Sequence, residues 1–195
     1  MKKTVKKIMV TTLAIGTLIT GFSYVNGAQA SEQTHTMQVS EKQNHKQLLL
    51  QTKKLADQGR VITSKDLGIG SSRRAIEAKW GKPDKNSKKF DLKYSKHSTN
   101  FYFSVDDEKQ KSAFNVETSD KRYSAVTYDE VKKTFGKANE EWFEQNDEGE
   151  FEYYVSYVVA GKKHYDLQFC FYSDKNGKKG KFKHVAVNDP GYIAP

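Results

Sequence analysis

Apolar and polar residues alternate with a period of two in six short stretches of the chain. In the first stretch Phe90, Leu92 and Tyr94 alternate with polar residues, and the others lie at residues 101–105, 114–117, 151–159, 167–172 and 182–187. A strand places every second side chain on the same side, so each stretch would have one apolar and one polar face. The pattern is typical of an antiparallel sheet that is covered on one face and open to solvent on the other.

Two shorter segments, residues 72–80 and 127–135, have the spacing of helices and repeat one another. Each begins at a hydroxyl side chain, and the second opens with the capping box Thr127-Tyr128-Asp129-Glu130. Each is followed by a glycine, Gly81 or Gly136, which suits a helix C-cap because it lacks a Cβ atom. Three of the strand stretches follow each helix, so the chain is predicted to contain a duplicated unit.

One further helix is predicted at residues 45–56, where leucines recur on one side and Gly59 ends the pattern. Residues 31–44 are polar and aperiodic, and we expect them to form a flexible leader. Residues 45–195 are then a single α+β domain made of two pseudo-repeats, about 60–120 and 121–190. A duplicated helix plus three-stranded antiparallel unit would place the helices on one face of an open sheet. Whether the two units share one sheet or form two lobes stays open.

The first thirty residues have the composition of a secretory signal peptide. Four lysines come first, an uncharged and mostly apolar stretch runs from Ile8 to Phe22, and Ala28-Gln29-Ala30 supplies small residues for cleavage. The apolar stretch contains glycines and is shorter than the ~20 residues that span a bilayer. We therefore expect cleavage, with no membrane span left afterwards, and a mature chain that is secreted or associated with the cell wall.

The chain is moderately basic. Its formal net charge is +9, and removal of residues 1–30 takes away four lysines and no acid, which leaves +5. A basic surface attracts polyanions, so an anionic wall polymer such as teichoic acid, or a lipid headgroup, is one partner to consider. The lysines of residues 175–183 would hold it. Nucleic acid is not expected as a partner, because the only arginines are Arg60, Arg73, Arg74 and Arg122.

A resemblance to known families follows from the helix ends. The glycine and hydroxyl residue before the first helix, and Trp80-Gly81-Lys82-Pro83-Asp84 at its end, resemble the helix–sheet repeat of the beta-lactamase-inhibitor-protein and BamE-type envelope families. The signal peptide and the tail Asp189-Pro190-Gly191-Tyr192 resemble small secreted Bacillus proteins of the YjgB type, whose function is unknown. The first resemblance implies protein binding through an exposed sheet face. The chain lacks the paired disulfides of the inhibitors and the lipid-modified cysteine of the assembly factors.

Residues suited to catalysis are few. Cys170 is the only cysteine, and a two-residue hairpin loop at Asn176-Gly177 would place it opposite Lys183, with His184 on the other face of the sheet. A cysteine–histidine pair would need a register that differs by one residue. The five histidines show no paired spacing and one cysteine cannot build a zinc site, so neither a metal nor another cofactor is expected. An envelope hydrolase is the remote alternative to a non-catalytic protein.

The polar face of the predicted sheet is the candidate binding site. Tyrosine combines a large contact area with a hydrogen-bonding tip, so it is enriched in protein interfaces. The candidate residues on this face are Tyr102, Tyr154, Ser156, Gln168, Tyr172 and Lys183. The alternative is that the tyrosines only pack against one another across strands. The leading hypothesis is a secreted, non-catalytic module, similar to an inhibitor or assembly factor, that binds a protein partner of unknown identity.

Overall fold

The computed structural model describes residues 29–161 and 163–191, and side chains from residue 43 onward. Nearly all of the predicted signal peptide lies outside the described residues. The described residues contain three α-helices, α1 (Gln29–Ala56), α2 (Arg73–Trp80) and α3 (Tyr128–Phe135). The strands are β1 (Asp91–Tyr94), β2 (Thr99–Phe103), β3 (Ala113–Thr118), β4 (Glu140–Gln145), β5 (Phe151–Ala160), β6 (His164–Ser173) and β7 (Lys179–Asn188).

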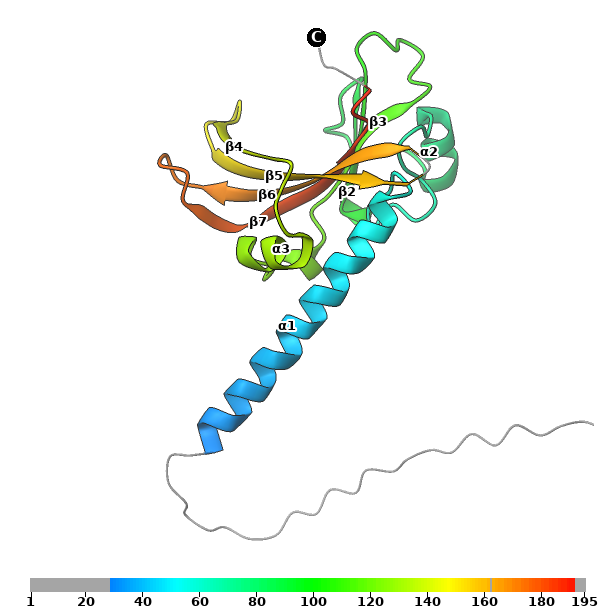
Figure 1. Cartoon of the computed structure of the whole chain (residues 1–195). Helices are drawn as coiled ribbons and strands as arrows, with labels where there is room; N and C mark the ends of the chain where they lie inside the picture. The colour runs from blue at the N-terminus through cyan, green and yellow to red at the C-terminus, as the bar shows by residue number, and fades with distance from the viewer. Residues whose placement is uncertain (1–28, 162, 192–195) are drawn as a thin grey trace, which may run out of the picture.

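All seven strands form one antiparallel sheet in the order β1-β2-β3-β7-β6-β5-β4. The expected α+β fold with an open sheet is confirmed, and the two units share a single sheet. The helices pack on one face of it (Figure 1), where Leu92, Phe101, Val116, Val155 and Phe169 are completely buried. The apolar half of the period-two pattern therefore forms the core. We call the opposite, helix-free side of the sheet the open face.

The helices α2 and α3 have the same ends, as the sequence predicts. The hydroxyl of Ser72 accepts a hydrogen bond from the Ala75 amide, and Thr127 and Glu130 form the expected capping box. Gly81 and Gly136 both have a φ of 81°, a value that side chains with a Cβ atom rarely adopt. The chain can therefore turn sharply from each helix toward the sheet.

The tertiary contacts of the two units also repeat. The ring of Trp80 lies 5.2 Å from Tyr94 and 5.4 Å from Phe101, and the ring of Phe135 lies 5.0 Å from Tyr157 and 5.3 Å from Phe169.

Hydrogen bonds at the helix ends follow the same scheme. The hydroxyls of Tyr94 and Tyr157 donate to the carbonyls of Gly81 and Gly136, respectively. Both bonds tie the end of a helix to the strand beneath it. The helix and strands α2-β1-β2-β3 thus correspond to α3-β5-β6-β7.

The two units join through their last strands. Val116 of β3 lies opposite Val187 of β7, Thr118 lies opposite Val185, and Glu117 and Ala186 pair between them. Val116 and Val185 hold equivalent places in the two units, because each pairs with the phenylalanine that contacts the helix. The junction is therefore symmetric, with an approximate two-fold axis through the central pair.

Strand β4 was missed by the sequence pattern, which predicts six strands rather than seven. Its sequence is Glu140-Glu141-Trp142-Phe143-Glu144-Gln145, and only Trp142 is partly buried. The strand lies at the edge of the sheet, so it contributes no alternating apolar face. In the first unit the corresponding stretch forms only an isolated bridge, between Lys88 and Asp91.

The predicted register of β6 and β7 is wrong. The hairpin loop is longer than two residues, because Ser173 pairs with Lys179 and the turn lies between them. A β-bulge then shifts the register, so that Cys170 lies opposite His184 rather than Lys183. An equivalent shift occurs in the first unit, where Tyr102 pairs with Asn115 and Phe103 with Ala113. Each bulge adds one residue to the strand and moves the following side chains to the other face.

Helix α1 is longer than expected. It begins at Gln29 rather than at residue 45, and its backbone is helical through residues 31–44, where the sequence predicts a flexible leader. The first turns of α1 extend away from the sheet (Figure 1), so they need no apolar stripe and leave no periodic signal. Among the described helices, none combines the length and the apolar character needed to cross a membrane.

The last turns of α1 are docked on the domain. Leu49 and Ala56 are buried in the core, and the hydroxyls of Thr52 and Tyr123 lie 2.6 Å apart. Nδ1 of His45 lies 3.1 Å from a carboxylate oxygen of Glu130 of α3. Glu130 therefore caps its own helix and also connects that helix to α1.

Candidate functional site

The six candidate residues all lie on the open face. Directly opposed residues of an antiparallel sheet share a face, and Tyr154 is opposed to Cys170, Ser156 to Gln168, and Tyr172 to Glu152. Tyr102 lies on the same side near the other end of the sheet, across from Asn115. The ammonium of Lys183 reaches the carboxylate of Glu152, which places its side chain there as well.

An ordered cluster surrounds Tyr154. The indole of Trp142 stacks on the Tyr154 ring with the centroids 4.9 Å apart and the planes 6° apart. The Tyr154 hydroxyl donates to Glu152, which is only 4% exposed and also accepts from Asn146 at 2.6 Å. The cluster was not predicted, because Trp142 belongs to the strand that the sequence pattern missed.

Lys183 neutralises this cluster. Its ammonium contacts Glu152, lies 2.7 Å from Glu150 and lies 5.1 Å from the centre of the Tyr172 ring. Burial opposes ionisation of Glu152, but hydrogen bonds from Lys183, Tyr154 and Asn146 outweigh it and lower its pKa. The side chains of this part of the open face are therefore held in place by contacts within the chain itself.

A second polar group lies at the centre of the sheet. Glu117 accepts hydrogen bonds from the amide of Asn100 at 3.2 Å and from the hydroxyl of Tyr102 at 3.3 Å. Its carboxylate also lies 3.9 Å from Nε2 of His184, whose ring is 6.1 Å from that of Tyr154. A continuous row of polar and aromatic side chains thus connects Tyr102 to Tyr154 across the sheet.

Exposure separates the candidate residues. Tyr172 is 41% exposed, and Val158 on the same face is 50% exposed, so both are available to a partner. Ser156 is buried, and so is Cys170 beside it. The open face is therefore less open than the sequence suggests, because its large side chains cover the small ones between them. Ser156 lies beneath the surface that a partner could touch.

The structure does bring Cys170 and His184 together, through the bulge described above. Nucleophilic attack needs a thiolate. Cys170 is fully buried, and burial raises the pKa of its thiol, with the negative charge of Glu152 adding to the effect. Burial also lowers the pKa of His184, which keeps the imidazole neutral. The two side chains are therefore a neutral thiol and a neutral imidazole, and not the thiolate–imidazolium pair of a reactive cysteine.

We expect Cys170 to be unreactive in the folded protein. Ellman's reagent at pH 8 should label it at least about a hundredfold more slowly than in the urea-unfolded chain, because the folded thiol is both buried and protonated. The measurement is the rate of thiolate release at 412 nm, with the unfolded chain as the control. Labelling of the folded protein at the unfolded rate would contradict this.

A further cluster lies on the helix side of β4. Glu141 accepts hydrogen bonds from Tyr128 at 2.7 Å and from Tyr153 at 2.9 Å, and it forms an ion pair with Lys132. Burial disfavours the charged form, but these three donors outweigh it and lower the pKa of Glu141 to about 2. A carboxylate held so firmly in its charged form is a poor general acid or base near neutral pH.

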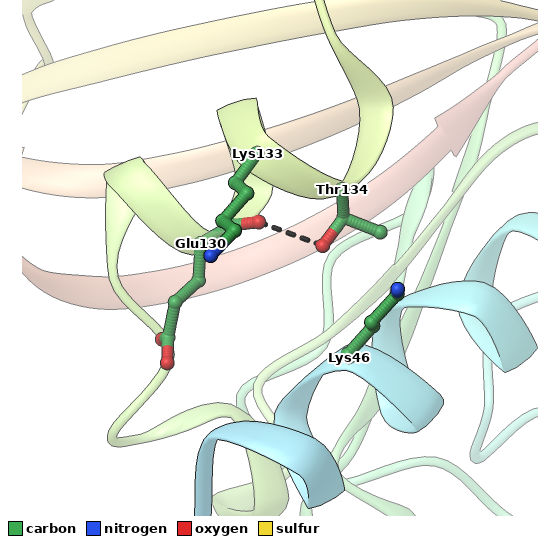
Figure 2. Close-up of a pocket in the computed structure, with 4 residues that line it drawn as sticks. All are labelled: Lys46, Glu130, Lys133 and Thr134. Atoms are coloured by element: carbon green, nitrogen blue, oxygen red, sulfur yellow. Dashed lines mark hydrogen bonds between the residues drawn. The ribbon is translucent and has the colours of Figure 1, made fainter. Parts of the chain in front are cut away.

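A small cavity of about 160 Å³ lies between α1 and α3. Figure 2 shows its lining residues, Lys46 from α1 and Glu130, Lys133 and Thr134 from α3. The Thr134 hydroxyl donates to the carbonyl of Glu130 at 2.7 Å, so it is already engaged within its helix. Because its described lining comes only from α1 and α3, we regard the cavity as the joint between the two helices.

The lysines near the β6–β7 turn are only partly free. Lys183 contacts two carboxylates, and Lys179 lies 4.6 Å from the centre of the Tyr128 ring and 4.2 Å from that of Tyr153. Within the part of the chain that the structure describes, no group of three or more histidine, cysteine or acidic side chains is placed to hold a metal ion.

Comparison with known proteins identifies the family alone. Neither a curated protein nor a solved structure matches the chain. The resemblance to beta-lactamase inhibitor proteins and BamE-type proteins therefore has no support from this comparison. A family model described as a domain of unknown function (DUF4309) matches residues 49–188, which is most of the chain and includes every strand. The chain belongs to the DUF4309 family.

Proposed function

We propose that the mature chain is a non-catalytic protein-binding module that works outside the cytoplasm, at the cell envelope or beyond it. The signal-like composition of residues 1–30 supports the location. The resemblance of the helix ends to inhibitor and BamE-type repeats supports a binding role. The observation that carries the proposal is the ordered aromatic and charged surface of the open face.

Three properties of that surface favour binding. Tyr172 and Val158 are exposed on the open face, so a partner could bury their surface on binding. The cluster around Tyr154 is held by stacking and hydrogen bonds, so little side-chain entropy remains to be lost on association. Tyrosine and tryptophan are also enriched at the centres of protein interfaces.

Binding of an anionic polymer is the second candidate, supported by the lysines at residues 175–181 on the β6–β7 hairpin. It is weaker, because Lys183 is neutralised by two carboxylates and Lys179 is packed between tyrosine rings. The two candidates respond differently to salt. Retention on teichoic acid should fall steeply between 50 mM and 500 mM salt, whereas a protein interface with an aromatic centre should persist.

Site-specific photo-crosslinking tests the proposal. A benzophenone amino acid at position 172 should yield one covalent adduct of defined mass with an envelope protein, because Tyr172 is exposed at the open face. The same group at position 50, where Leu50 is 48% exposed on α1, is the control and should yield none. Equal adducts from both positions, or none from position 172 in extracts of the native host, would exclude the open face as the interface.

A further inference from the structure

Strand β4 is an edge strand with a free hydrogen-bonding side. It pairs with β5 alone, through six consecutive residue pairs without a bulge. The backbone N–H of Asn146 donates to the backbone carbonyl of Glu150 at 2.9 Å, so these two residues form a hydrogen-bonded pair. Hydrogen-bonded and non-hydrogen-bonded pairs alternate along an antiparallel ladder. The backbone groups of residues 140, 142 and 144 therefore point toward β5, and those of Glu141, Phe143 and Gln145 point away from the sheet.

The other edge of the sheet is covered. The amide of Asp84 donates to the Lys93 carbonyl at 2.8 Å, and the hydroxyl of Ser87 accepts from the Lys93 amide at 2.9 Å. The segment before β1 therefore forms hydrogen bonds with the backbone groups of β1 that point away from the sheet. No described residue does the same for β4. Proteins usually protect a free edge with charged side chains, especially lysine, with proline or with a bulge. β4 has no lysine, proline or bulge, and its only charges are the carboxylates of Glu140, Glu141 and Glu144.

The side chains of β4 indicate what could pair with it. Glu140 and Glu144 flank the ordered Trp142 on the open face, and neither carboxylate has an ion pair among the described residues. On the other face Phe143 is 49% exposed, and the backbone of Gly177 approaches its ring. The edge thus offers an acidic, aromatic, acidic sequence on one side and an apolar side chain on the other.

Charge argues against a second copy of this chain as the occupant. Residues 139–161 contain seven acidic residues and no lysine or arginine. An antiparallel pair of β4 strands centred on Trp142 would bring Glu140 of one copy directly opposite Glu144 of the other, which destabilises a strand pair. A strand with basic side chains would instead stabilise the pairing, because each carboxylate would gain a cross-strand ion pair.

We propose that β4 binds an extended basic segment of a partner protein by antiparallel strand addition. The segment carries lysine or arginine opposite Glu140 and Glu144, an aromatic residue opposite Trp142, and an apolar residue opposite Phe143. Main-chain hydrogen bonds supply affinity in such complexes, and alternate side chains supply specificity. The inference goes beyond the function proposed above, because it concerns the edge of the sheet rather than its open face.

A seven-residue peptide, Thr-Lys-Val-Tyr-Val-Lys-Thr, tests the proposal directly on the full mature chain. We expect binding that weakens at least about tenfold when both lysines are replaced by glutamate. Methylation of the two valine backbone nitrogens should also weaken it at least about tenfold, since those amides would face β4. Methylation of the tyrosine nitrogen, which would point away from β4, is the matched control and should change little.

Hydrogen exchange places the peptide. The amides of Glu141, Phe143 and Gln145 should exchange freely in the protein alone and become protected when the peptide is present. Phe143→Pro removes one outward N–H without removing a bond to β5, and should abolish binding, whereas Phe143→Ala keeps that N–H and should weaken it less. Glu140→Lys combined with Glu144→Lys should favour the glutamate peptide over the lysine peptide.

Several results would overturn the inference. They are no binding at millimolar peptide, equal binding of the valine-methylated peptide, or protection of these amides by raised protein concentration alone, which would indicate self-pairing. Failure of this experiment is separable from failure of the function proposed above. Crosslinking at position 172 does not use the peptide, and the peptide experiment does not use position 172.

Discussion

Replacement of Phe169 by alanine should destabilise the protein by about 3–5 kcal/mol, the usual cost of removing a large aromatic ring from a close-packed core. Phe169 is fully buried in the second unit, where its ring contacts Phe135 at 5.3 Å and Tyr157 at 6.4 Å. Phe101 is the equivalent residue of the first unit, and Phe101→Ala should cost a similar amount. The measurement is urea unfolding at pH 7.

The two substitutions also test whether the units unfold together. Trp80 reports on the first unit and Trp142 on the second, so each can be followed in a variant that lacks the other tryptophan. Because β3 and β7 join the units into one sheet, Phe101→Ala should shift both signals to the same midpoint. A shift confined to Trp80 would show two independent folding units.

Replacement of Lys183 by methionine should destabilise the protein by about 2–3 kcal/mol at pH 7. Glu152 is buried, and loss of its cation leaves a carboxylate with only neutral hydrogen-bond donors. We expect a smaller destabilisation than for a fully buried ion pair, because the Lys183 side chain is 21% exposed. Lys181→Met, at an exposed lysine of the same strand, is the control and should change the free energy of unfolding by less than about 0.5 kcal/mol.

The effect should depend on pH in a defined direction. The pKa of Glu152 is lowered in the folded protein, so its ion pair stabilises the fold above the ordinary carboxyl pKa of 4.5 and is lost as the pH falls below that value. The difference between wild type and Lys183→Met should therefore shrink from pH 5 to pH 3. Urea unfolding across this range measures it. A difference that stays constant would mean that the loss comes from packing and not from charge.

Much of the fold could be predicted from local patterns. The six alternating stretches are strands because each has one side in the core, and the two short helices are marked by their capping residues. Strand β4 left no such signal, since an edge strand with acidic side chains has no apolar side to alternate. The beginning of α1 was missed for a related reason, because helical turns that extend away from the sheet need no apolar stripe.

The candidate site was predicted in outline only. Tyr102, Tyr154 and Tyr172 were placed on the correct side of the sheet, because strand alternation decides the face. The prediction that Cys170 lies opposite Lys183 was wrong, because a bulge shifts the register by one residue and places His184 there. A signal was available: in Phe182-Lys183-His184-Val185 two polar residues separate the apolar ones, and in a regular strand only one would. The burial of Ser156 follows from packing among its neighbours and could not be read from alternation.

The symmetric junction of β3 and β7 has a consequence for stoichiometry. The backbone repeats about its axis, yet the outward side chains do not, since Tyr102 occupies the place of Cys170 and Glu117 that of Ala186. A ligand that spans the junction therefore meets two unlike halves and can dock in only one orientation. If the open face binds a partner as proposed, we expect one copy of this chain to bind one copy of that partner.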